Sequence, residues 1–247
     1  MFSLCIPTMD RYNDFLSKYL PLYLENDLIE EIIITDENGN DIEKIKSAFS
    51  SNEKLVLVKN ESRLGPFQNK LKVCSFAKNE WIVLIDSDNF ADKNYFIVAN
   101  DYIEKNNIKD KNIILSPCKA KPNFDYSHLS GYIFKNGTIQ NNVYLDKGQS
   151  VQNNSFILMN TGNYIINKYL IDNVDLSWET ENIKQSSACD VIYFNTLLFE
   201  QLDLHLHVVP NLEYEHTKHD GSIYIQTYKK FHNFNEIVYE RYRKLQC

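Results

Sequence analysis

Short apolar runs alternate with segments of helical periodicity through the first half of the chain, and this alternation limits the fold more than any other feature. In one such segment Leu16, Leu20 and Leu24 recur at four-residue spacing, as on one face of an α-helix. We expect strands over residues 2–6, 32–35, 55–59, 81–85 and 113–116, with helices over residues 12–24, 42–49, 67–78 and 93–106. Strands separated by helices form right-handed βαβ units. The sequence therefore predicts an α/β, Rossmann-like fold in which helices flank a mainly parallel central sheet.

The second half of the chain has a less regular pattern. Alternating apolar residues around Asn136-Gly137 predict a hairpin over residues 126–143, because Asn-Gly suits a two-residue hairpin turn. We expect a short strand over residues 156–159, a helix over 190–202, a strand over 204–209 and a mostly helical end over 222–245. The strand over residues 204–209 contains His205 and His207, to which we assign no catalytic part. With 247 residues the chain fits one α/β domain.

Composition and charge argue against several classes of protein. The formal net charge of −7 disfavours an extended nucleic-acid interface, which needs a basic surface. No run of about 18 apolar residues occurs, and the first predicted strand begins too near Met1 for a secretion signal. We therefore predict a cytoplasmic protein without a transmembrane segment. Residues 218–247 hold six Lys or Arg against three acids, so peripheral contact with an anionic membrane stays open beside the simpler interpretation of a solvated helix face.

Five cysteines are scattered through the chain: Cys5, Cys74, Cys118, Cys189 and Cys247. Their odd number and the lack of a CxxC pair argue against a disulfide framework and against a zinc site. We expect reduced thiols that are mostly buried.

Polar residues follow every predicted strand as far as residue 90. The candidates are Pro7, Thr8 and Arg11 after the first strand, Asp36 and Glu37 after the second, Arg63 after the third, and Asp86, Ser87 and Asp88 after the fourth. Parallel strands present their carboxyl ends on one edge, where ligands of open α/β sheets bind. That edge would combine carboxylates, for a metal or for ribose hydroxyls, with arginine for phosphate. The sequence therefore outlines a nucleotide site.

Asp86 and Asp88 lie one residue apart at the end of the apolar run 81–85. Two such carboxylates offer hard oxygen ligands to Mg²⁺ or Mn²⁺, which takes further oxygens from water or from phosphate. The same residues are also good turn and N-cap chemistry. A cap of the following helix is therefore the alternative interpretation.

Several segments resemble the family 2 glycosyltransferases, which have the GT-A fold. FSLCIPTMDRYNDFLSKYL resembles the first strand and helix of that family, EIIITDENGND its second strand with the acid that contacts the base, and NESRLGPFQNKLKVCSFAKNEWIVLIDSDN the stretch that ends in its DxD metal motif. Farther on, GNYIINKYLI resembles the acceptor-side segment, SSACDVIYFNTLLFE the helix that usually opens with Glu-Asp, and YEHTKHDGSIY the His-containing loop over the donor. Cys189 stands in place of the first acid of that helix, and the Gln-x-x-Arg-Trp motif of processive members is absent.

The resemblance implies a metal-dependent, inverting and non-processive transfer. One sugar would move from a nucleotide diphosphate donor, with UDP favoured, to a hydroxyl of a glycan or other acceptor. Mn²⁺ or Mg²⁺ is the implied cofactor. Residues 1–117 would form the nucleotide-sugar-binding half and residues 118–247 an irregular acceptor-side half with a C-terminal helix, within a single domain.

The matched motifs imply roles for individual donor-site residues. Asp88 is the expected direct metal ligand, and Asp86 is expected to hold the ribose or a metal-bound water. The remaining donor-site residues are Asp36 at the nucleobase, Pro7, Thr8, Arg11 and Ser87 beside the same pocket, Arg63 at the diphosphate with Lys70 as second choice, and His216 or His219 at the metal or the diphosphate. For Arg63 and Lys70 a solvated helix face is the alternative, for Asp36 a plain turn, and for His216 or His219 a surface loop.

An inverting transfer also needs a general base near the acceptor hydroxyl. Asp190 is the first candidate, with Glu179 and Glu181 in reserve, and a helix N-cap is the alternative role for Asp190. On the acceptor side we expect Gly162, Asn163 and Trp178, with Tyr126, Tyr132 and Tyr144 as further aromatic residues that could stack on sugar rings.

Three other interpretations compete with a glycosyltransferase. A phosphatase of the haloacid dehalogenase type also carries DxD after a strand, but Phe90 occupies the place of its Thr or Val and the motif follows the fourth strand. A sugar-phosphate nucleotidyltransferase has a glycine-rich first loop, whereas IPTMDR contains no glycine. A non-catalytic relic that binds nucleotide or sugar is favoured by Cys189 and disfavoured by the intact Asp86, Asp88 and Asp190.

Overall fold

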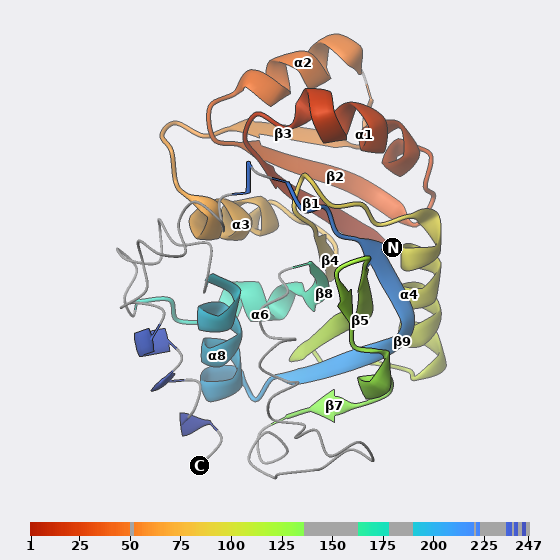
Figure 1. Ribbon diagram of the computed structural model, residues 1–247, viewed down its shortest axis with the longest axis vertical. Coiled ribbons are helices and arrows are strands. Elements are labelled where there is room, and N and C mark those ends of the chain that lie inside the picture. The colour runs from red at the N-terminus through yellow and green to blue at the C-terminus, as the bar shows by residue number, and fades with distance from the viewer. Residues whose placement is uncertain are drawn as a thin grey trace.

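The structure is a computed structural model and describes residues 1–49, 52–135, 163–177, 190–219, 221–222, 236–238, 240–241 and 244–245. Within these residues a nine-stranded sheet has the order β3-β2-β1-β4-β8-β5-β9-β7, and β6 pairs with β5 outside this order. The strands are β1 (Phe2–Thr8), β2 (Ile29–Asp36), β3 (Leu55–Lys59), β4 (Trp81–Leu84), β5 (Ile113–Lys121), β6 (Phe124–Asp125), β7 (Ile133–Phe134), β8 (Tyr164–Asn167) and β9 (His205–Glu215). Figure 1 shows them as the centre of the molecule.

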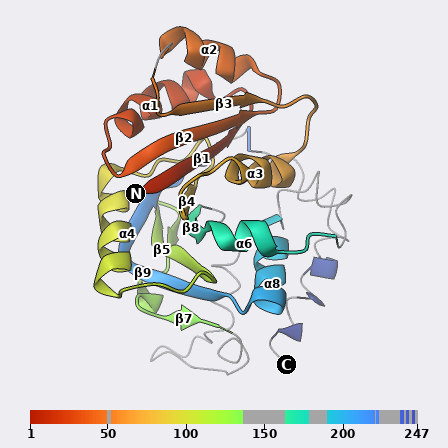
Figure 2. The same ribbon diagram turned by 180° about the vertical axis from the view of Figure 1, so that it is seen from behind.

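The first half of the sheet is parallel, as predicted, and the second half is mixed. β3, β2, β1 and β4 are parallel neighbours, and Figure 2 shows β2 between β1 and β3. β8 is antiparallel to both β4 and β5, whereas β9 is parallel to β5. The insertion of one reversed strand between β4 and β5 separates the regular first half of the sheet from the second half.

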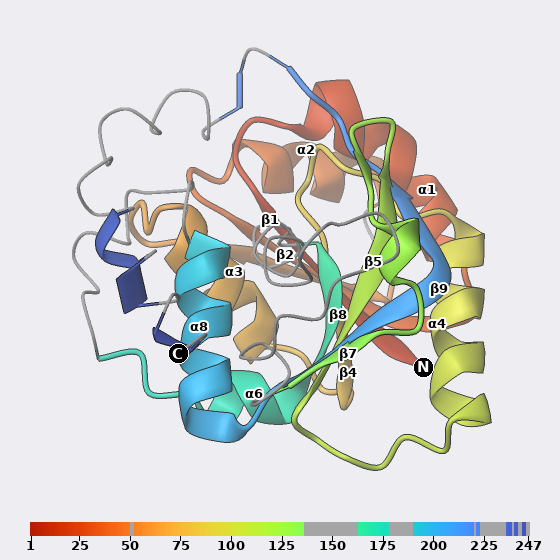
Figure 3. The ribbon, with the colours of Figure 1, turned by 60° about the horizontal axis from the view of Figure 1, so that its bottom comes forward.

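Helices cover both faces of the sheet. They are α1 (Ser17–Leu24), which continues a π-helical turn over Tyr12–Leu16, α2 (Asn40–Ala48), α3 (Pro66–Ser75), α4 (Lys93–Lys105), α6 (Lys168–Asn173) and α8 (Asp190–Leu202), with a 3-10 turn over Ser127–Leu129. Figure 3 shows α3, α6 and α8 on one side and α1 and α4 on the other. No helix in the described part of the chain is long and apolar enough to cross a membrane.

The strands in the middle of the sheet are buried on both faces because their side chains alternate between two apolar layers. Leu4 of β1 belongs to one cluster with Leu20 of α1 and Phe96 of α4. Its neighbour Cys5 belongs to the other cluster, with Val73 of α3. The continuous apolar composition of these runs is therefore explained by burial on both sides.

Most predicted elements of the first half are confirmed, and the second half departs from prediction. The bounds predicted for β3 and α8 agree with the structure, whereas β5 ends five residues past the predicted end, at Lys121, and β9 ends six residues past it, at Glu215. Where it is described, the segment predicted as a hairpin contains the 3-10 turn, and β7 pairs with β9 instead. The Asn136-Gly137 turn, the strand over 156–159 and most of the helical end over 222–245 lie outside the described residues.

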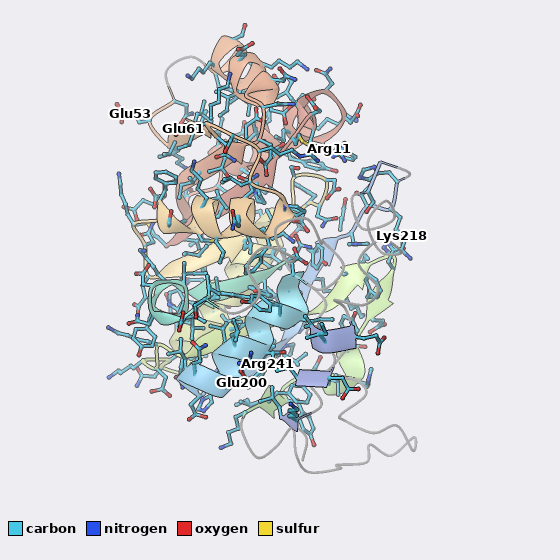
Figure 4. The ribbon with its side chains drawn as sticks, turned by 90° about the vertical axis from the view of Figure 1, so that its left-hand side faces the viewer. Arg11, Glu53, Glu61, Glu200, Lys218 and Arg241 are labelled. Carbon is cyan, nitrogen blue, oxygen red and sulfur yellow. The ribbon has the colours of Figure 1, made fainter. Side chains whose placement is uncertain are left out.

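Three of the cysteines, Cys5, Cys74 and Cys118, are buried free thiols, as predicted. Cys189 and Cys247 lie outside the described residues. In the basic C-terminal segment, Arg241 forms an ion pair with Glu200 of α8, with 2.7 Å between Nη2 and Oε2. Figure 4 shows the two residues side by side. Of the six Lys and Arg residues in this segment, Arg241 is therefore used in an ion pair within the protein.

His207 gives a test of how burial in β9 affects stability. Burial lowers its pKa to about 4, and its Nδ1 lies 3.1 Å from the Tyr102 hydroxyl. An unfolded histidine titrates near pH 6.5, so the unfolded chain binds more protons between pH 6.5 and pH 4, and stability falls as pH falls through this range. We expect wild type to lose about 2 kcal/mol more than His207→Gln in free energy of unfolding between pH 7 and pH 4.5.

Chemical denaturation at the two pH values measures this difference. His205→Gln, a change on the same strand at a partly exposed side chain, is the matched control and should keep the wild-type pH dependence. Equal losses in His207→Gln and wild type would show that the buried imidazole does not control acid stability.

Candidate functional site

A cleft of about 520 Å³ opens where β1 and β4 end at their carboxyl termini. Its walls come from distant parts of the sequence, including the loops after β1, β2, β3 and β4, the start of α3, the start of α8 and the segment after β9. Of the predicted site residues in the described part of the chain, it brings together Pro7, Thr8, Arg11, Arg63, Lys70, Asp86, Ser87, Asp88, Asn163, Asp190, His216 and His219. The convergence expected from a parallel sheet is therefore present.

The loop after β1 is held by a buried carboxylate from α2. Asp41 accepts hydrogen bonds from the Thr8 hydroxyl at 2.6 Å, from the Arg11 backbone N–H at 2.9 Å and from the Tyr12 backbone N–H at 2.9 Å. Its side chain is fully buried. Asp41 therefore fixes the wall of the cleft that Thr8 and Arg11 form.

The structure corrects the role predicted for Asp36. Its carboxylate is fully buried and accepts hydrogen bonds from the backbone N–H groups of Asp41 and Ile42, at 2.8 and 3.2 Å. It therefore binds the first turn of α2 and does not line the cleft. The polar turn before this helix, residues 38–39, is the sequence signal for such a carboxylate.

Glu37, the next residue, lines the cleft in its place. One oxygen, Oε2, accepts a hydrogen bond from the Leu64 backbone N–H at 2.7 Å. The other, Oε1, is buried and has no hydrogen-bond partner among the described residues. A buried carboxylate oxygen without a donor is unfavourable, so this end of the cleft is suited to a ligand that donates a hydrogen bond.

Asp86 is held from the neighbouring strand by Asn163, the residue before β8. The Asn163 Oδ1 accepts from the Asp86 backbone N–H at 2.6 Å, and its Nδ2 donates to the Asp86 carboxylate at 3.3 Å. Asn163 was predicted on the acceptor side, but its amide is used to fix Asp86.

The cap of α4 is Asp92, whose side chain accepts from the Tyr95 backbone N–H at 3.0 Å. The alternative of a helix cap is therefore wrong for Asp86 and Asp88.

The two histidines after β9 have different surroundings. His219 Nε2 lies 2.9 Å from Asp88 Oδ2, and its ring packs against Phe15 with 5.5 Å between centroids. His216 Nδ1 lies 2.8 Å from the Asn123 side-chain amide, and burial lowers the pKa of His216. His219, and not His216, is therefore the imidazole that meets the DxD carboxylate.

Contacts with the N-terminal part of the chain hold the segment that carries His219. The Arg11 guanidinium donates to the Gly221 carbonyl at 2.8 Å, and the Asn89 side chain accepts from the Thr217 backbone N–H at 2.9 Å. Figure 4 shows Arg11 and Lys218 on the same side of the molecule, and both line the cleft. Arg11, predicted in the donor site, thus also positions this segment, and Asn89 was missed although it directly follows Asp88.

Asp88 and His219 are in direct hydrogen-bond contact, with 2.9 Å between Oδ2 and Nε2. A carboxylate oxygen and an imidazole nitrogen can also bind a divalent ion in place of this contact. No group of three His, Cys, Asp or Glu residues that could hold a metal ion is found among the described residues. An ion there would therefore take its other ligands from water and from phosphate, as Mg²⁺ and Mn²⁺ commonly do.

Asp190 is the first residue of α8 and one wall of the cleft. Its side chain is 3% exposed, and its Oδ2 lies 3.2 Å from Lys70 Nζ. Lys70 Nζ also lies 3.3 Å from Asp86 Oδ1. Burial raises the pKa of Asp190, and the Lys70 ammonium opposes that rise. The structure thus places Lys70, predicted as a second choice for the diphosphate, between two carboxylates.

The remaining predicted residues are only partly described. Arg63 lies at the cleft with an exposed side chain and forms no ion pair within the described ranges. Tyr126 lines the cleft and stacks on Phe124 with 6.1 Å between ring centroids, whereas Tyr132 packs against an apolar cluster. Gly162, Trp178, Glu179, Glu181 and Tyr144 lie outside the described residues.

Solved structures of similar fold belong to S. aureus TarS. The TarS fragment 1-349 in complex with UDP-GlcNAc matches with a TM-score of 0.62 and 14% identity over 97% of this chain and 66% of that one. The same fragment in complex with UDP matches with a TM-score of 0.59 and 13% identity, over 93% and 64% of the two chains. Without a stated ligand it matches with a TM-score of 0.58 and 13% identity, over 86% and 59%. This chain therefore spans 59% to 66% of those fragments, and the likeness shows the fold.

The sequence itself identifies the family. No curated protein matches the chain. The family model described as glycosyl transferase family 2 matches residues 3–164, which is more than half of the chain and runs from the second residue of β1 through β7. The expected GT-A fold and the expected family are both confirmed, and this chain belongs to glycosyl transferase family 2.

Proposed function

We propose that this protein transfers a single sugar, with inversion, from a nucleotide diphosphate donor to a hydroxyl of a glycan or other acceptor, and that UDP is the favoured nucleotide. The observation that carries the proposal is the Asp88–His219 pair. It lies in the same cleft as Glu37 and Arg63 from the loops after β2 and β3, and as the buried carboxylate of Asp190. One cleft therefore holds groups suited to contact a nucleobase, a diphosphate and an acceptor hydroxyl.

The proposed nucleobase contact is Glu37. Its unpartnered Oε1 would accept a hydrogen bond from a base N–H, and uracil offers such a donor at its imide nitrogen. Thr8 and Arg11 line the same cleft. The UDP complexes of the similar TarS fragment agree with this choice of nucleotide.

Arg63 is the proposed partner of the diphosphate, because an exposed guanidinium can bind phosphate oxygens in pairs. Asp88 and His219 would hold Mn²⁺ or Mg²⁺, which when bound offsets the charge that develops on the departing diphosphate. Asp190 would accept the proton of the attacking hydroxyl. Its burial raises the pKa of the carboxyl and so makes it a stronger base than an exposed aspartate.

The family model matched by residues 3–164 is that of a glycosyl transferase, which argues against the phosphatase whose nucleophile would be Asp86. The division into two halves, the acceptor residues, the cytoplasmic location and the membrane contact stay predictions.

Binding of nucleotides with Mn²⁺ tests the proposed donor site, because a ligand of the folded state raises the melting temperature. We expect UDP with Mn²⁺ to raise it more than ADP, GDP or CDP, and UDP without the ion to raise it less. In His219→Ala we expect the Mn²⁺-dependent affinity for UDP to fall at least about tenfold, whereas His205→Gln, on β9, should bind like wild type. No stabilisation by any of these nucleotides would exclude the proposed donor site and favour a non-catalytic relic.

A further inference from the structure

We propose that Lys70 is a positioning residue that holds Asp190 in place as the proton acceptor, by tying it to Asp86 of the DxD segment. The inference rests on the proposed function, and it replaces the diphosphate contact expected for this lysine. Lys70 lies on α3, Asp86 follows β4, and Asp190 begins α8. The three residues therefore join parts of the chain that are 16 and 120 residues from Lys70 in sequence.

The distances show one ammonium shared by two carboxylates. Lys70 Nζ lies 3.3 Å from Asp86 Oδ1 and 3.2 Å from Asp190 Oδ2. Its side chain is 13% exposed, that of Asp190 3% and that of Asp86 33%, so water screens the contact with Asp190 weakly and the contact with Asp86 more strongly. An ammonium has three N–H donors. With two of them directed at carboxylates, most of its charge is already balanced and little remains for a diphosphate.

The bridge is anchored at both ends. On one side, Asn163 holds the Asp86 carboxylate and backbone. On the other side, Asp190 Oδ1 accepts from the Val191 backbone N–H at 2.9 Å, while Oδ2 faces Lys70. Both oxygens of Asp190 are therefore oriented, and the carboxylate cannot rotate without breaking one contact. A base must lie within hydrogen-bond reach of the proton that it removes, so this orientation bears directly on the transfer step.

The opposing idea is that Lys70 binds the donor diphosphate directly. That role would make its loss weaken nucleotide binding. In contrast, a residue that acts through Asp190 should affect turnover and leave nucleotide affinity nearly unchanged. Arg63, which lies at the cleft with an exposed side chain, is the cation that we assign to the diphosphate.

The test compares Lys70→Met, Lys70→Arg, Asp190→Asn and the double variant Lys70→Met/Asp190→Asn. UDP-GlcNAc with Mn²⁺ is the first probe, with release of UDP to water as the readout, and binding of UDP is measured by calorimetry. Where another sugar nucleotide gives faster release in wild type, that nucleotide replaces it. Lys72→Met is the matched control, because Lys72 lies on the same helix and does not line the cleft.

We expect Lys70→Met to reduce kcat about 100-fold, while its Kd for UDP changes less than threefold. The kcat of Lys70→Arg should be at least about tenfold higher than that of Lys70→Met. The double variant should be no slower than Asp190→Asn alone, because both changes remove the same function. Losses that multiply in the double variant, or a Kd for UDP that rises as much as kcat falls, would overturn the inference while wild-type turnover stays intact. Absence of both UDP binding and turnover in wild type would instead overturn the proposed function, and the inference with it.

Discussion

Replacement of Asp190 by asparagine is expected to slow sugar transfer by about three orders of magnitude, since loss of a general base removes about 10²- to 10⁴-fold. Asparagine has nearly the same shape, and its amide oxygen can still face Lys70, which lies 3.2 Å from Oδ2 of the native carboxylate. The amide cannot accept a proton from an acceptor hydroxyl. Steady-state release of nucleotide from a nucleotide sugar gives kcat, and calorimetry with UDP gives donor affinity, which we expect to stay within a few fold of wild type.

The matched control for this change is Asp172→Asn. Asp172 lies on α6 and pairs with Lys168 through an exposed carboxylate, so its loss should leave turnover unchanged. If Asp190→Asn keeps the wild-type kcat, Asp190 is not the general base, and Glu179 and Glu181 become the candidates for it. A loss that appears only in KM would assign Asp190 to acceptor binding instead.

Replacement of Asp41 is expected to give the largest loss of stability. Its buried carboxylate accepts from the Thr8 hydroxyl and from the backbone N–H groups of Arg11 and Tyr12. A hydrogen bond to a charged group contributes about 1.5–3 kcal/mol, and unpaired buried donors add their desolvation. We therefore expect Asp41→Ala to lower the free energy of unfolding by about 3–5 kcal/mol. Urea unfolding at pH 7 measures it.

The same substitution should weaken UDP binding, because the loop that carries Thr8 and Arg11 loses its anchor. Glu43→Gln is the matched control. Glu43 lies in the first turn of the same helix, is exposed, and interacts mainly with the helix dipole, so its loss should change stability by about 0.3–1 kcal/mol. A small effect in Asp41→Ala would mean that water replaces the carboxylate and that the loop is not anchored from α2.

Local sequence patterns were sufficient for the parts of the fold whose burial is uniform. β3 and α8 were predicted with the bounds that the structure has, because each is a periodic apolar run that ends abruptly in polar residues. Parallel pairing followed from the βαβ alternation and brought Thr8, Arg63 and Asp88 into one cleft. The position of β8 between β4 and β5 was not predictable in this way, since pairing between distant strands leaves no local periodicity.

Site residues were harder to predict where two adjacent side chains compete for different roles. Asp36 ends β2 and Glu37 follows it, but successive side chains of a strand point to opposite faces of the sheet. Only the position of α2 decides that Asp36 caps the helix and Glu37 meets the cleft. Similarly, the motif around Lys70 predicted a phosphate contact, whereas the position of α8 brings Asp190 to its ammonium. Contacts across long sequence separations therefore bear on roles that a motif alone leaves open.

The central place of β8 has a consequence for how the chain is made. β4 and β5 both pair with Tyr164–Asn167, a segment that begins 43 residues after the end of β5 at Lys121. The other edge of β5 pairs with β9, which is synthesised later still. Exposed edges of apolar strands promote aggregation. We therefore expect the nascent chain to be most prone to aggregation after β5 has emerged and before β8 and then β9 have paired with it.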